Sequence, residues 1–177
     1  MRYDKLKDLN RDNARWELPG DRTKNGVPHV VPLSADAVAV LRQACSASPE
    51  GRPFVFPGPV LEGLPITAHA LAVAMARMGR RFDMASPGAA TWNAEAPSPH
   101  DLRRTAATRM AALGTPAEDV AACLNHKRRD VTGVHYDQYD RLREKRRALE
   151  LWAGHLGLIL TDGTHEQANI VLLGPAM

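Results

Sequence analysis

An Asn25-Gly26 pair between two short extended runs is the feature that most limits how this chain can fold. Asn and Gly both accept the positive φ angles that a tight turn between antiparallel strands requires. We therefore expect a hairpin whose strands lie within residues 14–19 and 27–33. Residues 5–10 offer only a weak third strand, so the predicted sheet is small and antiparallel.

Helical patterns fill most of the chain beyond this hairpin. Ser34 is a capping residue for the first helix, and Thr67 has the same role for a second one. Proline suits the first position of a helix, which is where Pro99 and Pro116 stand. The helix after Ser34 is expected over residues 35–47, and later helices are expected over residues 99–113, 116–125 and about 137–156. The predicted fold class is mainly α with a small antiparallel β-sheet (α+β).

Two stretches in the middle of the chain receive different predictions. The spacing of Leu71, Met75, Met78 and Phe82 is that of one face of a helix, and we expect this face to be buried. Residues 83–98 show no ordering pattern, and we expect them to form a loop.

The composition is typical of a soluble globular domain. Of the 177 residues, 44% are hydrophobic and 24% are charged, which suffices for one domain with a real core. No apolar run approaches the ~20 residues of a membrane span, and the N-terminus lacks the apolar segment of a secretion signal. Cys45 and Cys123 lie in apolar helical patterns, which predicts reduced side chains. We therefore expect a cytoplasmic protein that does not contact a membrane.

Basic residues are unevenly distributed along the chain. The net charge is only +3, but Lys and Arg gather between residues 100 and 150, with Lys-Arg-Arg runs at 127–129 and 145–147. Such clustering favours a polyanionic partner. A solvated helix face explains the same charge equally well, so charge alone leaves both interpretations open.

Five polar side chains are candidates for a functional site. They are Lys24 in the hairpin, His100 and Arg103 in one first helical turn, His126 after a helix end, and Tyr136 ten residues later. Each also has an ordinary structural interpretation: a hairpin lysine is usually solvated, and a histidine at a helix C-terminus gains from the helix dipole.

Metal and serine-hydrolase chemistry find little support. His100, His126 and His135 lack the HxxxH, HExxH or CxxC companions of a zinc site, so no metal is expected. The GxSxG turn of an α/β-hydrolase is also missing from the sequence.

The same side chains suit the cleavage of a phosphodiester. Without a metal, this reaction needs cations on the non-bridging oxygens, an acid for the leaving oxygen and a nucleophile. The planar fork of Arg binds phosphate oxygens in pairs, and a Tyr hydroxyl can form a covalent phosphate ester.

Four blocks carry these candidates: "TKNGVPHVVPLS", "SPHDLRRTAATRMAALG", "VAACLNHKRRDVTGVHYDQYD" and "EKRRALELWAGHL". In this order they resemble the catalytic domain of tyrosine recombinases, most closely the phage and genomic-island integrase branch. The resemblance covers roughly residues 6–156 and implies the tyrosine recombinase catalytic-domain fold. It also implies an enzyme that cuts one DNA strand, holds a 3′-phosphotyrosine and rejoins it to a 5′-hydroxyl without any cofactor.

The resemblance assigns a role to each candidate. Lys24 would protonate the leaving 5′-oxygen, Arg103 would grip the scissile phosphate, and His100 would assist proton transfer. His126 would hydrogen-bond the phosphate, and Tyr136 would be the nucleophile.

The tyrosine assignment departs slightly from the family pattern. In many members the tyrosine stands nine positions after the later histidine, whereas Tyr136 stands ten positions after His126 and His135 occupies the ninth position. Tyr139 is the weaker alternate to Tyr136. DNA contacts are expected for Arg104, Lys127, Arg128 and Arg129.

The resemblance further implies a first arginine, followed closely by a glutamate, ahead of the hairpin. Arg2 has neither the spacing nor the glutamate, so we do not assign it that role. We expect residues 1–156 to be a catalytic domain incomplete at its N-terminus, and residues 157–177 to be a C-terminal tail. A fragment, a misassigned start or a remnant gene would each account for this, and DNA cleavage by the chain alone would be impaired.

The expected partners are double-stranded DNA and, by family analogy, further copies of the chain assembled on it. Two alternatives stay open. One is a non-catalytic DNA-binding or regulatory remnant of an integrase, and the other is a helical protein-interaction domain without DNA affinity.

Overall fold

The computed structural model describes residues 6–7, 9, 13–47, 53–58, 64–67, 69–81, 88–126 and 140–162. The strands are β1 (Leu6–Lys7), β2 (Arg15–Leu18) and β3 (His29–Pro32), and a 3-10 helix, η2 (Gly20–Arg22), follows β2. The α-helices are α1 (Ala35–Ala47), α2 (Ala70–Gly79), α3 (Ala89–Ala94), α4 (Pro99–Ala112), α5 (Ala117–Cys123) and α7 (Leu142–Asp162). The predicted fold class, mainly α with a small antiparallel sheet, is confirmed.

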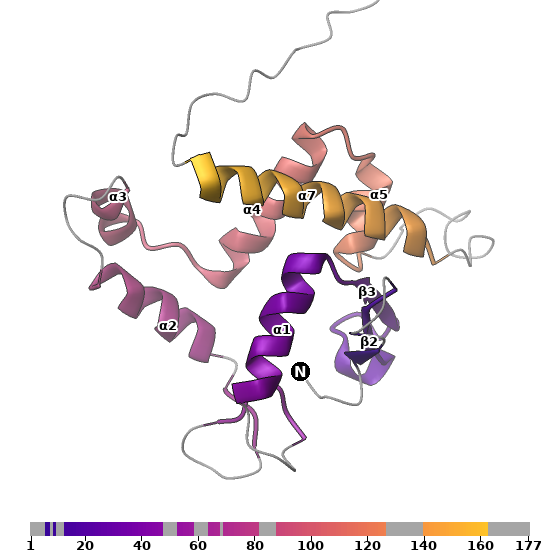
Figure 1. Ribbon diagram of the computed structural model, residues 1–177, viewed down its shortest axis with the longest axis horizontal. Helices are drawn as coiled ribbons and strands as arrows, with labels where there is room; N and C mark the ends of the chain where they lie inside the picture. The colour runs from indigo at the N-terminus through magenta and orange to yellow at the C-terminus, as the bar shows by residue number, and fades with distance from the viewer. Residues whose placement is uncertain are drawn as a thin grey trace, which may run out of the picture.

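Helices α4, α5 and α7 lie together, the sheet lies beside them at one end, and α2 and α3 lie on the opposite side (Figure 1). The hydrophobic core lies between α4, α5 and α7. Met110, Val120 and Ala148 are its buried residues. The side chains packed against them are Ala107, Cys123, Leu124, Leu149 and Trp152.

The hairpin forms as predicted, with a more elaborate turn. The strand order is β1-β2-β3, all antiparallel, and Trp16 of β2 pairs with both Leu6 and Val31. The weak third strand therefore exists as the two-residue β1. The connection from β2 to β3 is longer than a two-residue turn because it contains η2, and Gly26 has the expected positive φ of 72°.

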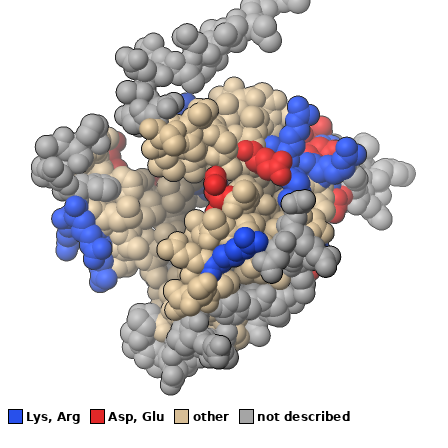
Figure 2. Space-filling view, in the orientation of Figure 1, with Lys and Arg blue, Asp and Glu red and all other residues tan. Residues whose placement is uncertain are grey.

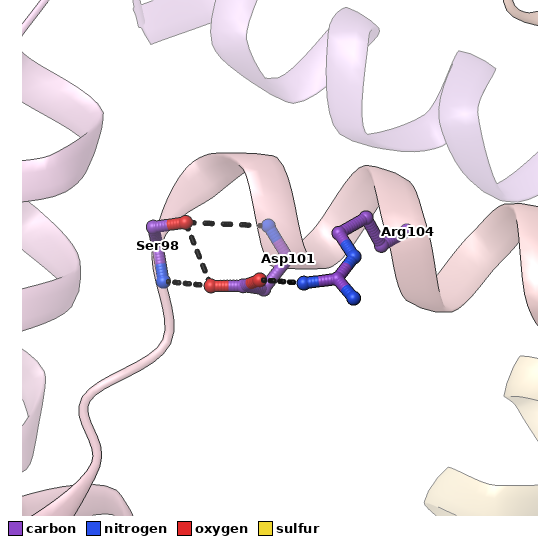
Figure 3. Close-up of polar contacts among 3 residues, drawn as sticks. All are labelled: Ser98, Asp101 and Arg104. Atoms are coloured by element: carbon purple, nitrogen blue, oxygen red, sulfur yellow. Dashed lines mark hydrogen bonds and ion pairs between the residues drawn. The ribbon is translucent and has the colours of Figure 1, made fainter.

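Local capping signals place the starts of α1 and α4. Ser34 Oγ accepts a hydrogen bond from the Ala37 N–H at 3.3 Å. At α4, Ser98 Oγ accepts from the Asp101 N–H at 3.3 Å, and Asp101 Oδ2 accepts from the Ser98 N–H at 2.9 Å (Figure 3). The Ser98 hydroxyl also donates to Asp101 Oδ2 at 2.7 Å, and this bond, followed by the one from the Ser98 N–H, lowers the pKa of the Asp101 carboxyl. The reciprocal cap fixes the first turn of α4, which carries His100 and Arg103.

The two cysteines agree with the prediction of reduced side chains. Neither Cys45 nor Cys123 forms a disulfide, and both side chains are half-buried. Burial raises the pKa of the Cys123 thiol to about 11, so this side chain is a neutral packing group at neutral pH.

The predicted methionine stripe is only partly buried. Met75 is 4% exposed, but Leu71 and Met78 are 50% and 47% exposed. Phe82 lies outside the described residues. The prediction of a fully buried stripe was wrong because the spacing shows which side chains share a face, whereas burial depends on what covers that face.

A helix, α3, occupies part of the 83–98 stretch that was predicted to be a loop. It packs against α2, where Gly79 is buried beside Trp92. A Cβ added at Gly79 would lie 2.8 Å from Trp92 Cδ1, so this close approach requires glycine. Only two turns of Ala-rich sequence form α3, which is too short for a periodic signal.

Other helix ends also differ from the predictions. α2 begins at Ala70 with His69, not Thr67, as its N-cap residue. α5 is shorter than predicted at both ends, and Pro116 is its N-cap residue, with an extended ψ of 142°. α7 begins at Leu142 and continues past residue 156 to Asp162. The tail beyond Asp162 lies outside the described residues, and its separate status stays a prediction.

Two buried side chains join the sheet to the helices. His29 of β3 hydrogen-bonds the Cys123 carbonyl at 3.2 Å, and Lys145 Nζ donates to the Val30 carbonyl at 2.9 Å. Lys145 is only 4% exposed, and Arg146 donates to the Ala14 carbonyl at 3.3 Å. The second Lys-Arg-Arg run is therefore partly structural, which corrects its interpretation as a solvated or polyanion-binding cluster.

On the face drawn in Figure 2, the Lys and Arg side chains form separate groups, and one group is mixed with Asp and Glu. This face shows no continuous basic surface among the described residues. None of the helices in the described part of the chain has the length and apolar character needed to cross a bilayer.

The difference in burial between Met110 in the core and Met78 on the exposed face of α2 predicts a difference in the stability of their alanine variants. Met110→Ala should lower the free energy of unfolding by about 2–5 kcal/mol, because Met110 is 2% exposed and its removal leaves a cavity. Met78→Ala, the same change on the exposed face of α2, should cost about 0.5 kcal/mol or less. Urea unfolding of both variants checks this, and equal losses would contradict the assignment of the core.

A second prediction concerns pH. Burial lowers the pKa of His29, and the nearby Lys145 ammonium lowers it further. The hydrogen bond to the Cys123 carbonyl opposes this shift, and the charge of Arg103 adds slightly to it. The unfolded chain therefore binds the His29 proton more readily, so stability is lost as pH falls below 6.5 through the lower folded value. Urea unfolding between about pH 5 and pH 8 should show this loss in the wild type and a smaller one in His29→Gln. Parallel pH profiles would contradict it.

Candidate functional site

Three consecutive backbone carbonyls, those of the last residue of α5 and of the two residues after it, accept hydrogen bonds from three separate parts of the chain. The last four carbonyls of a helix have no partner within the helix, so donors must come from elsewhere. Here they come from β3, from α4 and from the connection between β2 and β3. The donor and acceptor pairs are His29 with Cys123, Arg103 with Leu124, and Asn25 with Asn125.

The turn that follows α5 is fixed by Asn125. Its φ of 52° lies in the left-handed region, which Asn tolerates better than most residues. The Asn125 N–H donates to the Ala122 carbonyl at 3.2 Å, and the His126 N–H donates to the Ala121 carbonyl at 3.0 Å. This pair of bonds closes the helix end and holds the backbone of His126 against it.

The side chains of Asn25 and Asn125 bond reciprocally. Asn25 Nδ2 donates to the Asn125 carbonyl at 2.6 Å, and Asn125 Nδ2 donates to Asn25 Oδ1 at 3.3 Å. Asn125 Nδ2 also donates to the Val27 carbonyl at 3.2 Å. Because Lys24 directly precedes Asn25, these bonds tie the backbone next to Lys24 to the turn that carries His126.

The first turn of α4 supplies the guanidinium of the site. Arg103 Nη2 donates to the Leu124 carbonyl, and a guanidinium has five N–H donors, so others are left for an anion. His100 is exposed one turn earlier on the same helix. The Arg104 side chain is 73% exposed and lies 3.5 Å from Asp101 Oδ1 (Figure 3), a weak contact that leaves it accessible to solvent.

The structure thus brings three of the predicted segments to one place. The hairpin segment of Lys24, the α4 turn of His100 and Arg103, and the turn of His126 meet at the end of α5. The remaining predicted residues lie outside the described part of the chain, namely Lys127, Arg128, Arg129, Tyr136 and Tyr139.

Sequence reasoning missed the residues that hold these segments together. Asn25 was recognised only as a turn residue, and the structural roles of His29 and Asn125 were not predicted. An asparagine just after a helical pattern does indicate a left-handed cap at position 125. Its pairing with Asn25 joins residues 100 positions apart, which no local signal reveals.

The arrangement is suited to binding an anion. An ammonium, a guanidinium and two imidazoles belong to the segments that meet here, and all of them donate hydrogen bonds when protonated. Within the described ranges, no three His, Cys, Asp or Glu side chains are grouped as a metal site would require.

Comparisons with known proteins agree with this arrangement. Residues 5–143 match the model of the phage integrase family. The chain is 28% identical over 140 residues to prophage integrase IntA of Escherichia coli K12, covering 79% of this chain and 30% of that protein. It is 29% identical over 153 residues to prophage integrase IntZ of the same organism, covering 86% of this chain and 34% of that protein.

The chain therefore spans about a third of the length of these two relatives. No solved structure matches it. The family match covers well over half of the chain and includes Lys24, Arg103 and His126. On this evidence the chain belongs to the phage integrase family.

Proposed function

We propose that this chain is the catalytic domain of a tyrosine-type site-specific DNA recombinase. The observation that carries the proposal is the meeting of the Lys24, Arg103 and His126 segments at the C-terminal end of α5. Membership of the phage integrase family supports it. The substrate is double-stranded DNA in the cytoplasm, and copies of the chain assemble on it.

The chemistry follows from the donor groups. Arg103 and His126 bind the non-bridging oxygens of the scissile phosphate, and His100 assists the proton transfers. The Tyr136 oxygen attacks phosphorus and forms the 3′-phosphotyrosine while the bond from phosphorus to the 5′-oxygen breaks. Lys24 gives its proton to that leaving oxygen. The reverse sequence joins the strand to a new 5′-hydroxyl, and both directions need only the chain and the DNA.

The rate of the 177-residue chain alone should be low. The resemblance provides two arginines for the phosphate, and the matching blocks of this chain contain only Arg103. Removing one donor from such a clamp costs about 10²–10³-fold in rate. We therefore propose impaired cleavage rather than none.

The nucleophile assignment can be tested with a nicked suicide substrate, which traps the covalent complex because the released strand diffuses away. Tyr136→Phe should abolish the adduct, since the attacking oxygen is gone, and non-covalent DNA binding should persist. Tyr139→Phe is the matched control and should retain the adduct. The readout is a protein–DNA species that survives denaturing electrophoresis.

Three outcomes of this test have different meanings. Loss of the adduct in Tyr139→Phe alone would show that the nucleophile is misassigned. An efficient wild-type adduct would contradict the impaired rate. Salt-dependent DNA binding without any adduct, even after long incubation, would favour the non-catalytic integrase remnant instead.

The phosphate role of Arg103 predicts a change in the salt dependence of DNA binding. Arg103→Ala should lower the slope of log affinity against log salt by about 1, because one phosphate contact is lost. Arg109→Ala removes an exposed arginine near the other end of α4 and should leave the slope unchanged. Fluorescence anisotropy at several salt concentrations measures both variants, and equal effects would argue against a specific contact by Arg103.

A further inference from the structure

We infer that Asn25 and Asn125 act as a positioning pair, an amide clasp, that holds Lys24 at the phosphate site. The inference rests on the proposed function, because Lys24 acts as a proton donor at this site only if a phosphodiester is cleaved there. The clasp consists of the reciprocal bonds of the two side chains, at 2.6 and 3.3 Å, and the bond from Asn125 Nδ2 to the Val27 carbonyl at 3.2 Å.

The orientation of both amides is fixed by their partners. The Asn125 and Val27 carbonyls can only accept, so each must face an NH₂ group. This leaves Asn25 Oδ1 as the acceptor for Asn125 Nδ2, and the same oxygen accepts from the Val27 N–H at 3.1 Å. The two side chains are half-buried, so their bonds compete less with water than surface bonds do.

The clasp does something that the internal bonds of the turn do not. Thr23 Oγ1 lies 2.8 Å from the Val27 carbonyl oxygen and 3.0 Å from the Gly20 carbonyl oxygen, so its one hydrogen bonds within the connection and stabilises the shape of the turn. These bonds leave the position of the turn relative to α5 open. The amide bonds between Asn25 and Asn125 set that position next to Lys24, whose own side chain is exposed.

The residue type at position 125 supports this role. A left-handed residue after a helix is most easily supplied by glycine, which adopts a φ of 52° without steric cost. Asn bears some of that cost but adds an amide that reaches the hairpin. The side chain of Asn125 thus has a use beyond ending the helix.

Asn125→Gly is the informative variant, because it keeps the left-handed turn and removes only the amide. Asn25→Ala removes the other half of the clasp. Asn125→Ala is a contrast that also strains the turn, so it separates helix capping from clasping. Far-UV circular dichroism and urea unfolding establish that each variant is folded before it is compared.

The readout is the reactivity of individual lysine amines towards an amine-labelling reagent, measured by peptide mass spectrometry with and without duplex DNA at low salt. In the wild type, DNA should protect both Lys24 and Lys127. In Asn125→Gly and Asn25→Ala, the protection of Lys24 should fall by up to about tenfold, the effect of one or two lost hydrogen bonds, while Lys127 stays protected.

A chemical rescue separates positioning of the proposed acid from a general loss of structure. Replacing the leaving 5′-oxygen by sulfur makes a leaving group that needs no proton. Adduct formation by Asn125→Gly, slowed on ordinary DNA, should then return to the wild-type rate.

The outcomes are distinguishable. Unchanged protection of Lys24 in both variants would overturn the clasp, and so would equal loss of protection at Lys24 and Lys127. Absence of protection at both lysines in the wild type would contradict the proposed DNA-binding function itself, and the clasp with it.

Discussion

The backbone carbonyls at and just after the end of α5, which the helix itself cannot satisfy, are the constraint on which the rest of the site depends. The end of α5 is half-buried, and a helix end whose carbonyls are partly removed from water needs donors from elsewhere in the chain. The donors here are His29, Arg103 and Asn25, which belong to three different elements. Satisfying the backbone of α5 therefore also collects the segments that the proposed chemistry needs.

The other end of α5 is held just as firmly. Arg141 bonds Asp119 at 2.7 Å and Glu118 at 3.2 Å, and these contacts raise the pKa of its guanidinium. Arg141 and Asn125 are the two non-glycine residues with positive φ in the described part of the chain, and both contact α5 or the turn after it. In the sequence they flank the stretch that carries Tyr136. α5 thus anchors the chain on both sides of the proposed nucleophile.

Local signals predicted a large part of the fold. The Asn25-Gly26 turn, the Ser34 cap and the Ser98 cap each act within a few residues, so the hairpin, α1 and α4 follow from the sequence. The candidates Lys24, Arg103 and His126 were chosen by residue type and by the family resemblance, and the structure brings their segments together, while their catalytic roles stay a prediction.

Features that depend on distant partners were not predictable in this way. The exposure of Met78 depends on what covers α2, and the amide clasp joins residues 100 positions apart. In the sequence, Lys145 looks like part of a charged surface. In the structure its ammonium donates a hydrogen bond to the Val30 carbonyl, and burial lowers the pKa of Lys145. Tertiary contacts thus decide whether a cation is structural or available to a ligand.

In this proposal, the end of α5 gathers one anion-binding site from three segments. The most direct measurement is the change in backbone amide chemical shifts of the ¹⁵N-labelled chain on titration with duplex DNA. We expect the largest changes among the described residues to occur together at Lys24 and Asn25, at the first turn of α4, and at Asn125 and His126. Changes centred on α2 and α3, with the end of α5 unaffected, would contradict it.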